Sequence, residues 1–265
     1  VYVASLDGYL HAIDAATGER VFKVDTLPAR GPAHPYSITG APVIAGDAVI
    51  IGAAGADFAG ARGYVGAWDL KTGAARWRFY TVPRDPALGA QDQPHLNAAI
   101  ATWDARHDWT SGGGGNVWDG IAYDAALGLV YVGTANGAPY NIKADGRSGG
   151  DDLYAASILA IRVKDGSLAW HYQTTPGDVW DYDSTQKLVL ADLPIDGKPH
   201  PVVMQASKNG FLYALDRATG AVLAAHNYVY VDWTLGIDPA THRPRPNPAA
   251  DYSKGARFVA PGMAG

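Results

Sequence analysis

The sequence has 265 residues, enough to bury a large hydrophobic core in one or two domains. Its net charge is −5 and its basic residues form no runs or patches, which argues against a nucleic-acid partner. The chain has no cysteine, which excludes disulfides and thiolate metal sites, and glycine or aspartate interrupts its long apolar runs, so no segment is predicted to span a membrane.

The composition indicates an all-β protein. The chain is 48% hydrophobic and contains 32 glycines, 17 prolines, 15 tyrosines and 8 tryptophans, without long helical periodicity. An apparent strand already begins at residues 1–5, with no initiator methionine or signal sequence, and residues 259–265 look equally unfinished. We therefore expect an internal fragment of a larger protein.

A strand–turn–strand unit recurs four times along the chain, at residues 10–22, 65–77, 159–170 and 213–224. Each copy joins two strands through an Asp-x-x-Thr-Gly or Lys-Asp-Gly hairpin turn. The spacing is 55 positions from Asp14 to Asp69 and 54 from Arg162 to Asp216. A period near fifty with paired strands predicts the blades of a β-propeller.

Three of the four copies carry an aromatic residue four positions after the glycine of the turn. We expect these residues, Phe22, Trp77 and Trp170, to pack between neighbouring blades, whereas the fourth copy has Ala224 at this position. The interval between the second and third copies is longer, which predicts an insertion at residues 83–115. Further strands are expected at residues 42–51, 121–123, 129–133 and 201–206.

An acidic segment follows the third copy, at residues 174–186. The alternation of Leu168, Trp170 and Tyr172 predicts a strand that ends just before it. Asp181 and Asp183 are two positions apart, so an extended backbone would project both carboxylates to the same side. Two such charges about 5 Å apart repel by about 3 kcal/mol at an effective dielectric of about 20. A shared proton or a cation would relieve this repulsion, and a solvated acidic loop is the alternative interpretation.

The repeats resemble the tryptophan-docking blades of quinoprotein (PQQ-dependent) alcohol dehydrogenases. Further stretches resemble that family's active-site segments in the same order, at residues 38–42, 52–57, 112–118, 133–137, 180–183 and 207–211. The resemblance implies an eight-bladed propeller with PQQ and a metal ion on its axis. It also implies that residues 1–265 are part of a single PQQ-binding propeller domain, contain about four blades and are truncated at both ends.

The resemblance assigns three residues to the cofactor. Trp118 matches the tryptophan whose indole stacks beneath the flat PQQ ring, for which a large apolar face is suited. Thr39 matches a residue that forms a hydrogen bond with PQQ. Lys208 matches a catalytic cation that contacts the quinone oxygens and stabilises the charge that develops on them.

The resemblance also implies a metal site and a general base. Asp57 and Asn136 match metal-ligand positions, whose oxygen atoms suit a hard cation. Asp181 matches the base that takes the proton of the alcohol and also belongs to the metal site. Asp183 matches an additional aspartate found in lanthanide-dependent members. The family normally has glutamate at the position of Asp57, and the missing methylene shortens the reach by about 1.5 Å.

These resemblances predict a periplasmic, PQQ-dependent alcohol dehydrogenase that uses a lanthanide ion, oxidises small alcohols to aldehydes and passes electrons to a cytochrome c. The fragment is expected to be inactive alone, because half of the cofactor shell would be missing. Two alternatives stay open: the same enzyme with calcium, and a non-catalytic propeller that acts as a scaffold or binding module. A scaffold would keep the repeats without retaining the residues of the site.

Overall fold

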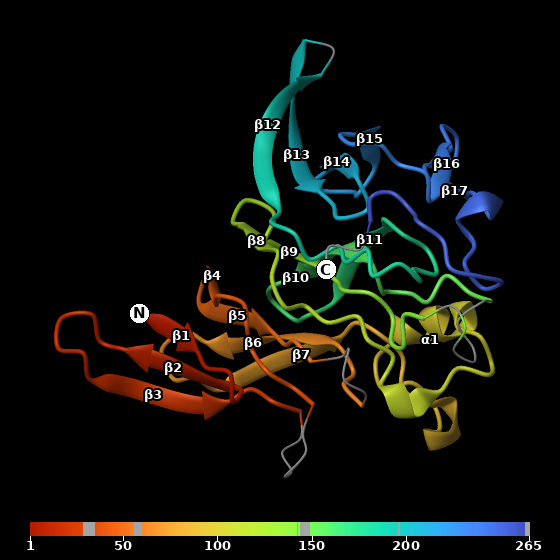
Figure 1. Ribbon diagram of the computed structural model, residues 1–265. Coiled ribbons are helices and arrows are strands. Elements are labelled where there is room, and N and C mark those ends of the chain that lie inside the picture. Colours follow the sequence, from red (N-terminus) through yellow and green to blue (C-terminus); the bar gives the residue numbers. More distant parts are fainter. Residues whose placement is uncertain (29–34, 56–59, 142, 144–148, 196, 263–265) are drawn as a thin grey trace.

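The computed structural model describes residues 1–28, 35–55, 60–141, 143, 149–195 and 197–262 (Figure 1). Within them the chain forms antiparallel sheets of consecutive strands, one after another along the sequence. The first sheet has three strands, β1 (Tyr2–Ala4), β2 (Tyr9–Ile13) and β3 (Arg20–Asp25). The second has four, β4 (Val43–Ala45), β5 (Ala48–Gly52), β6 (Tyr64–Asp69) and β7 (Ala75–Tyr80).

The third and fourth sheets also have four strands each. The third contains β8 (Ile121–Asp124), β9 (Leu129–Gly133), β10 (Ser157–Arg162) and β11 (Leu168–Gln173). The fourth contains β12 (Val189–Ile195), β13 (Lys198–Ala206), β14 (Phe211–Asp216) and β15 (Val222–Asn227), and a two-stranded sheet, β16 (Thr234–Ile237) and β17 (Pro244–Pro246), follows it. The predicted all-β, partial propeller fold is confirmed.

The four sequence repeats are the last two strands of the first four sheets, and local hydrogen bonds explain their turns. In the first copy, Asp14 Oδ1 accepts hydrogen bonds from the backbone N–H groups of Ala16 and Thr17. Asp69 and Asp216 do the same in the second and fourth copies. The glycine that closes each turn has φ between 71° and 75°, a conformation that glycine adopts without steric cost.

In the first three copies of the repeat, the aromatic residue packs against the turn glycine of the next sheet, as predicted. A Cβ atom on Gly166 would lie only 2.7 Å from Trp77 Cδ2, and Trp77 Nε1 donates a hydrogen bond to Val163 O at 2.8 Å. Phe22 meets Gly73 and Trp170 meets Gly220 in the same way. The indoles therefore join consecutive sheets through apolar contact and one hydrogen bond each.

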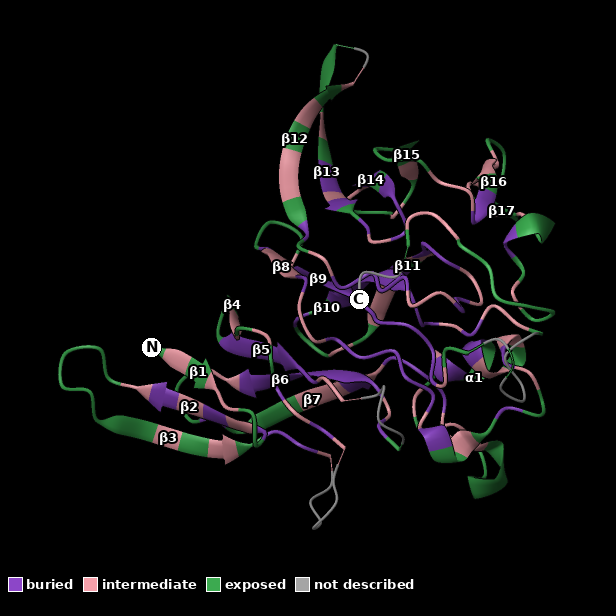
Figure 2. Cartoon of the chain, in the orientation of Figure 1, coloured by how far each residue is buried: buried purple, intermediate pink, exposed green. Residues whose placement is uncertain are grey.

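Hydrophobic cores fill the spaces between consecutive sheets, so strand residues are buried on both faces. In β5, all five residues are buried (Figure 2). Ile50 packs with Val132 in the core between the second and third sheets, whereas Val49 and Ile51 pack with Leu10 between the first and second. This alternation of neighbouring residues between two cores follows from the two-residue period of a strand.

Some of the predicted strands need correction. Residues 42–51 form two strands, because Gly46 adopts a φ of 61° and the chain turns between β4 and β5. Residues 201–206 are the end of the longer strand β13, which pairs with β12 in a hairpin that extends away from the other sheets (Figure 1). β12, β16 and β17 were not predicted; β12 and β17 contain prolines, which weaken a strand signal, and β16 pairs with β17.

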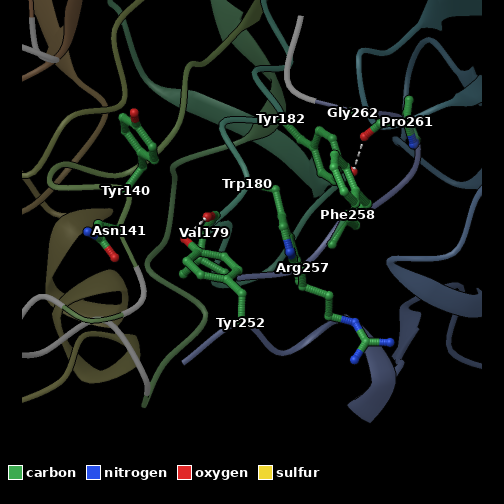
Figure 3. Close-up of a pocket in the computed structure, with 11 residues that line it drawn as sticks. Tyr140, Asn141, Val179, Trp180, Tyr182, Tyr252, Arg257, Phe258, Pro261 and Gly262 are labelled. Atoms are coloured by element: carbon green, nitrogen blue, oxygen red, sulfur yellow. Dashed lines mark hydrogen bonds between the residues drawn. The ribbon is translucent and has the colours of Figure 1, made fainter. Parts of the chain in front are cut away.

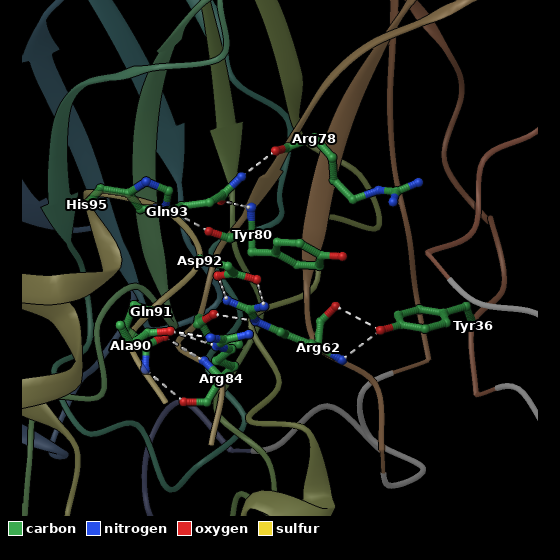
Figure 4. A network of polar contacts seen from close by, with 11 residues as sticks. Tyr36, Arg62, Arg78, Tyr80, Arg84, Ala90, Gln91, Asp92, Gln93 and His95 are labelled. Atoms are coloured by element: carbon green, nitrogen blue, oxygen red, sulfur yellow. Dashed lines mark hydrogen bonds and ion pairs between the residues drawn. The ribbon is translucent and has the colours of Figure 1, made fainter. Parts of the chain in front are cut away.

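The predicted insertion at residues 83–115 lies outside the sheets and contains the short helices η2 (Pro86–Leu88), α1 (Leu96–Ala99), η3 (Ile100–Thr102) and η4 (Trp109–Ser111). A polar network attaches its start to β7 (Figure 4). Gln93 Oε1 accepts a hydrogen bond from Tyr80 N at 2.8 Å, and Gln93 Nε2 donates one to Arg78 O at 2.6 Å. The guanidinium of Arg62, which precedes β6, also forms two hydrogen bonds with the Asp92 carboxylate, at 2.7 and 2.9 Å. Another short helix, η5 (Pro248–Ala250), follows β17. None of the helices in the described part of the chain has the length and apolarity that crossing a bilayer requires.

Candidate active site

Five segments that connect strands bring the predicted site residues together. Thr39 lies between β3 and β4, Trp118 between β7 and β8, and Asn136 between β9 and β10. The acidic segment lies between β11 and β12, and Lys208 lies in the turn from β13 to β14. Thr39, Trp118, Asp181 and Asp183 line one pocket of about 390 Å³ together with Ser37, Ala54, Gly55 and Tyr140. Asn136 and Lys208 are not among its lining residues, but they donate hydrogen bonds to Asp183 and Asp181, respectively.

Lys208 connects the two carboxylates of the acidic segment. Its Nζ donates a hydrogen bond to Asp181 Oδ2 at 2.9 Å and lies 3.9 Å from Asp183 Oδ2. The side chains of Asp181 and Lys208 are 28% and 20% exposed, respectively, and Asp181 lines the pocket.

Asp183 is the more deeply buried carboxylate. Its Oδ1 accepts a hydrogen bond from the backbone N–H of Asn136 at 2.9 Å. Burial raises the pKa of Asp183 to about 7; the hydrogen bond from Asn136 opposes this rise, and the negative charge of Asp181 adds to it. A cation bound near the two carboxylates would stabilise their ionised forms.

The backbone of the acidic segment is not the extended one that the sequence argument considered. An extended backbone would have projected Asp181 and Asp183 to the same side, but no strand forms between β11 and β12 and Asp181 has a φ of 62°. Both residues nevertheless line the same pocket. The left-handed conformation at Asp181, not strand alternation, accompanies this arrangement.

A close approach between two backbone segments places Asp183 beside Asn136. A Cβ atom on Gly133 would lie 1.7 Å from Ser184 O, so this position at the end of β9 accommodates only glycine. Ser184 N also donates a hydrogen bond to Thr134 O at 3.0 Å. The Gly133–Asn136 segment and the acidic segment therefore run against each other.

Asn136 could supply a neutral oxygen ligand to a metal ion. Its side chain is buried, and Nδ2 donates a hydrogen bond to Gly137 O at 2.9 Å, a contact that does not involve the amide oxygen. The remaining predicted metal ligand, Asp57, lies outside the described residues. In the described part of the chain, no group of three or more Asp, Glu, His or Cys side chains is arranged to hold a metal ion. The described candidates are therefore Asn136, Asp181 and Asp183.

The other wall of the pocket is suited to a flat, polar cofactor. The half-buried indole of Trp118 supplies an apolar face, and Thr39 Oγ1 donates a long hydrogen bond to Trp118 O at 3.4 Å. Carboxylate oxygens and an ammonium group stand in the same pocket or beside it. The donor set therefore fits a planar anionic quinone together with a hard cation.

A second pocket, of about 440 Å³, adjoins the first through Tyr140, which lines both. Its walls are largely aromatic, with Trp180, Tyr182, Tyr252 and Phe258 among the lining residues (Figure 3). Trp180 and Tyr182 are the sequence neighbours of Asp181. Apolar walls beside a carboxylate and an ammonium group suit a ligand with a carbon chain and a polar end.

The sequence interpretation missed Ser37 and Tyr140 as pocket residues and included Ala54 and Gly55 only as part of the stretch at residues 52–57. Ser37 precedes the stretch at residues 38–42, and Tyr140 follows the stretch at 133–137 by three positions. Extending each stretch by a few residues could have found both.

The fold and this pocket define a β-propeller with a candidate cofactor site built from the connections between its strands. Residues 1–232 match the family described as PQQ, glucose/ethanol/alcohol dehydrogenase, beta-propeller domain, and the chain belongs to this family. It is 52% identical over 254 residues to the quinohemoprotein alcohol dehydrogenase ADH IIB of Pseudomonas putida. That match covers 96% of this chain and 36% of the relative, so the chain spans about a third of the relative's length.

Solved structures of related enzymes have the same fold. The quinohemoprotein alcohol dehydrogenase from Comamonas testosteroni superposes with a TM-score of 0.92 at 44% identity, covering 98% of this chain and 38% of that structure. A europium-containing methanol dehydrogenase superposes with a TM-score of 0.86 at 33% identity, covering 100% of this chain and 46% of that structure.

Proposed function

We propose that this chain is part of a single PQQ-binding propeller domain of an alcohol dehydrogenase that oxidises small alcohols to aldehydes. The observation that carries the proposal is the pocket itself, in which Thr39, Trp118, Asp181 and Asp183 stand together, with Lys208 bound to Asp181. The names of the relatives support the same activity.

The residues of the chain have distinct roles in this proposal. Asp181 takes the proton of the alcohol hydroxyl, because it is a partly exposed carboxylate beside the aromatic pocket. Lys208 donates hydrogen bonds where negative charge develops, and Trp118 and Thr39 bind and orient the cofactor. When bound, PQQ accepts the electrons removed from the alcohol, and the metal ion acts as a Lewis acid.

The metal ion of this proposal is a lanthanide, held by Asp181, Asp183, Asn136 and Asp57. Two carboxylates close to one ammonium group leave excess negative charge, which a trivalent ion compensates better than a divalent one. The europium in the related methanol dehydrogenase supports this preference. Calcium is the alternative metal, favoured if the short side chain of Asp57 cannot reach the ion.

We further propose a periplasmic location and a cytochrome c as electron acceptor. The electron acceptor is supported by the relatives that are named quinohemoproteins, because a haem group can receive electrons one at a time. The location is supported by the class of these relatives, which are bacterial quinoprotein alcohol dehydrogenases.

The decisive experiment is reconstitution of the full-length protein with PQQ and either lanthanum or calcium, followed by measurement of alcohol-dependent dye reduction. We expect reduction that requires alcohol, PQQ and metal together. A folded protein that shows no alcohol-dependent reduction with either metal would contradict the proposed enzymatic activity and favour a non-catalytic scaffold.

A further inference from the structure

Asp178 is a buried carboxylate that none of the proposed steps uses. Its side chain accepts two backbone hydrogen bonds, one at each oxygen: Oδ1 from Trp180 N at 2.9 Å and Oδ2 from Tyr182 N at 2.7 Å. Only 1% of the residue is exposed. These two N–H groups belong to the residues on either side of Asp181, so one carboxylate fixes the backbone both before and after it.

We call this pair of hydrogen bonds to Asp178 the clamp. The backbone conformation that it encloses, at Asp181, is an unfavourable one. Asp181 has a φ of 62°, in the left-handed region that residues with a side chain rarely adopt. Such a conformation persists only where surrounding contacts determine it, and hydrogen bonds to a charged acceptor are among the stronger contacts available. The carboxylate of Asp178 supplies two of them within five residues.

The side chains next to Asp181 are held as well, by contacts with Trp233 and Pro261. The rings of Trp180 and Tyr182 both pack against Trp233, with centroids 5.6 Å apart in each pair. The Tyr182 hydroxyl also donates a hydrogen bond to Pro261 O at 2.6 Å. With its neighbours anchored, the side chain of Asp181 accepts the hydrogen bond from Lys208.

We propose that Asp178 is a positioning residue that holds the Asp181 carboxylate in the orientation its role as base requires. This inference rests on the proposed function. Misplacement of a catalytic group by about 1 Å can reduce the rate about 100-fold. Loss of the clamp would let the turn at residue 181 relax toward a more common backbone conformation and move the carboxylate away from the pocket.

The test is Asp178→Asn in the full-length enzyme loaded with PQQ and metal. An amide has one acceptor oxygen, so it keeps one of the two hydrogen bonds and turns an NH₂ group toward the other N–H. Asp124→Asn is the matched control, because Asp124 is also buried and accepts backbone N–H groups, from Ala126 and Leu127 in the turn between β8 and β9. Asp178→Ser is made in parallel as a smaller replacement.

For Asp178→Asn we expect kcat to fall about 10- to 100-fold while KM and bound PQQ stay within about twofold of the control. Hydrogen exchange of a peptide spanning residues 179–183 should be faster than in the control, which reports on the clamp without reference to activity. A kcat equal to that of the control, or hydrogen exchange no faster than in the control, would overturn the inference. Failure of both position-178 variants to fold while Asp124→Asn folds would make Asp178 a folding determinant and overturn it too.

A double variant separates this inference from the proposed function. If Asp178 acts only through Asp181, adding Asp178→Asn to Asp181→Asn should cause no further loss in single-turnover reduction of the cofactor. Independent, multiplicative losses would overturn the positioning role. An inactive Asp181→Asn beside a fully active Asp178→Asn would overturn this inference alone, whereas a fully active Asp181→Asn would overturn the assignment of the base and this inference with it.

Discussion

Lys208 Nζ lies 2.9 Å from Asp181 Oδ2, although 27 positions separate the two residues in the sequence. The contact joins the segment after β11 to the turn after β13, and thus two neighbouring sheets. The backbone N–H of Lys208 also donates a hydrogen bond to Gln186 Oε1 at 3.1 Å, which attaches the lysine to the acidic segment at a second point. The proposed base and the proposed charge-stabilising cation are therefore held as one unit.

The first prediction concerns Asp181→Asn in the full-length enzyme. The substitution removes the basic carboxylate but keeps its shape, so we expect turnover to fall by about 10²- to 10⁴-fold, the usual contribution of general-base catalysis. Bound PQQ and metal should be retained, which absorbance and metal analysis can measure. Asp47→Asn is the control, because Asp47 also forms an ion pair, with Arg76, but lies in the β4–β5 turn. Near-normal turnover of Asp181→Asn would identify another group as the base.

The repeats could be predicted because they depend on local sequence, whereas the site residues, which come from five separate segments, were predicted from the family resemblance. The turn of each repeat is stabilised by an aspartate within three residues of its partners, so the motif alone indicates the hairpin. The docking role of Trp77 follows from the same register, because the repeat places every indole opposite the next turn glycine.

The conformation at Asp181 could not be predicted, because it depends on contacts that the sequence pattern does not reveal. The two-residue spacing of Asp181 and Asp183 suits an extended backbone, whereas the Asp178 carboxylate holds a left-handed turn. The strand β12 was missed for a comparable reason. Pro194 pairs with Pro199 across a hairpin, and prolines at both positions hide a strand that the rest of the fourth sheet supports.

The second prediction compares Gly166→Ala with Gly18→Ala. Both glycines close a repeat turn with nearly the same φ, 72° and 73°, so alanine costs a similar amount of backbone strain at each. A Cβ at position 18 meets no atom within 4 Å, whereas one at position 166 would lie 2.7 Å from Trp77 Cδ2. We expect Gly166→Ala to lower the free energy of unfolding by about 1–3 kcal/mol more, the usual range for overpacking.

Urea unfolding of the two variants in the full-length protein measures this difference. The Gly18 variant is the control, since it carries the backbone strain without the contact. Equal destabilisation of both variants would show that docking of Trp77 on the turn does not contribute to the stability of the sheets.

The third prediction concerns pH. His95 stacks on Phe79, with ring centroids 4.0 Å apart, and its Nε2 lies 2.9 Å from Tyr80 O in the network of Figure 4. Burial lowers the pKa of His95 in the folded state. As the pH falls below the unfolded pKa of about 6.5, the unfolded state binds a proton that the folded state does not, so stability declines.

The difference in unfolding free energy between about pH 7.5 and about pH 5 should therefore be smaller in His95→Gln than in the wild type. The lost ring stacking also destabilises this variant, but equally at both pH values. His226→Gln, at an exposed position on β15, is the control and should keep the wild-type pH dependence. An unchanged pH dependence in His95→Gln would assign the effect to other groups.

The last prediction concerns the choice of metal. Asp183 adds a second carboxylate beside Asp181, and the single ammonium group of Lys208 lies 2.9 and 3.9 Å from the two. A trivalent ion supplies more positive charge than calcium and favours a high number of oxygen ligands, so we expect greater activity after reconstitution with lanthanum than with calcium.

Removing the charge of Asp183 should move this preference toward calcium. Asp183→Ala removes both the charge and the acceptor of the Asn136 N–H group, whereas Asp183→Asn removes the charge and keeps an oxygen in its place. If charge decides the preference, both variants should shift the ratio of lanthanum to calcium binding, measured by titration of the metal-free protein with PQQ present. A shift in Asp183→Ala alone would assign the effect to the geometry of the Asn136 segment. Tighter binding of calcium than of lanthanum by the wild type would contradict the lanthanide proposal.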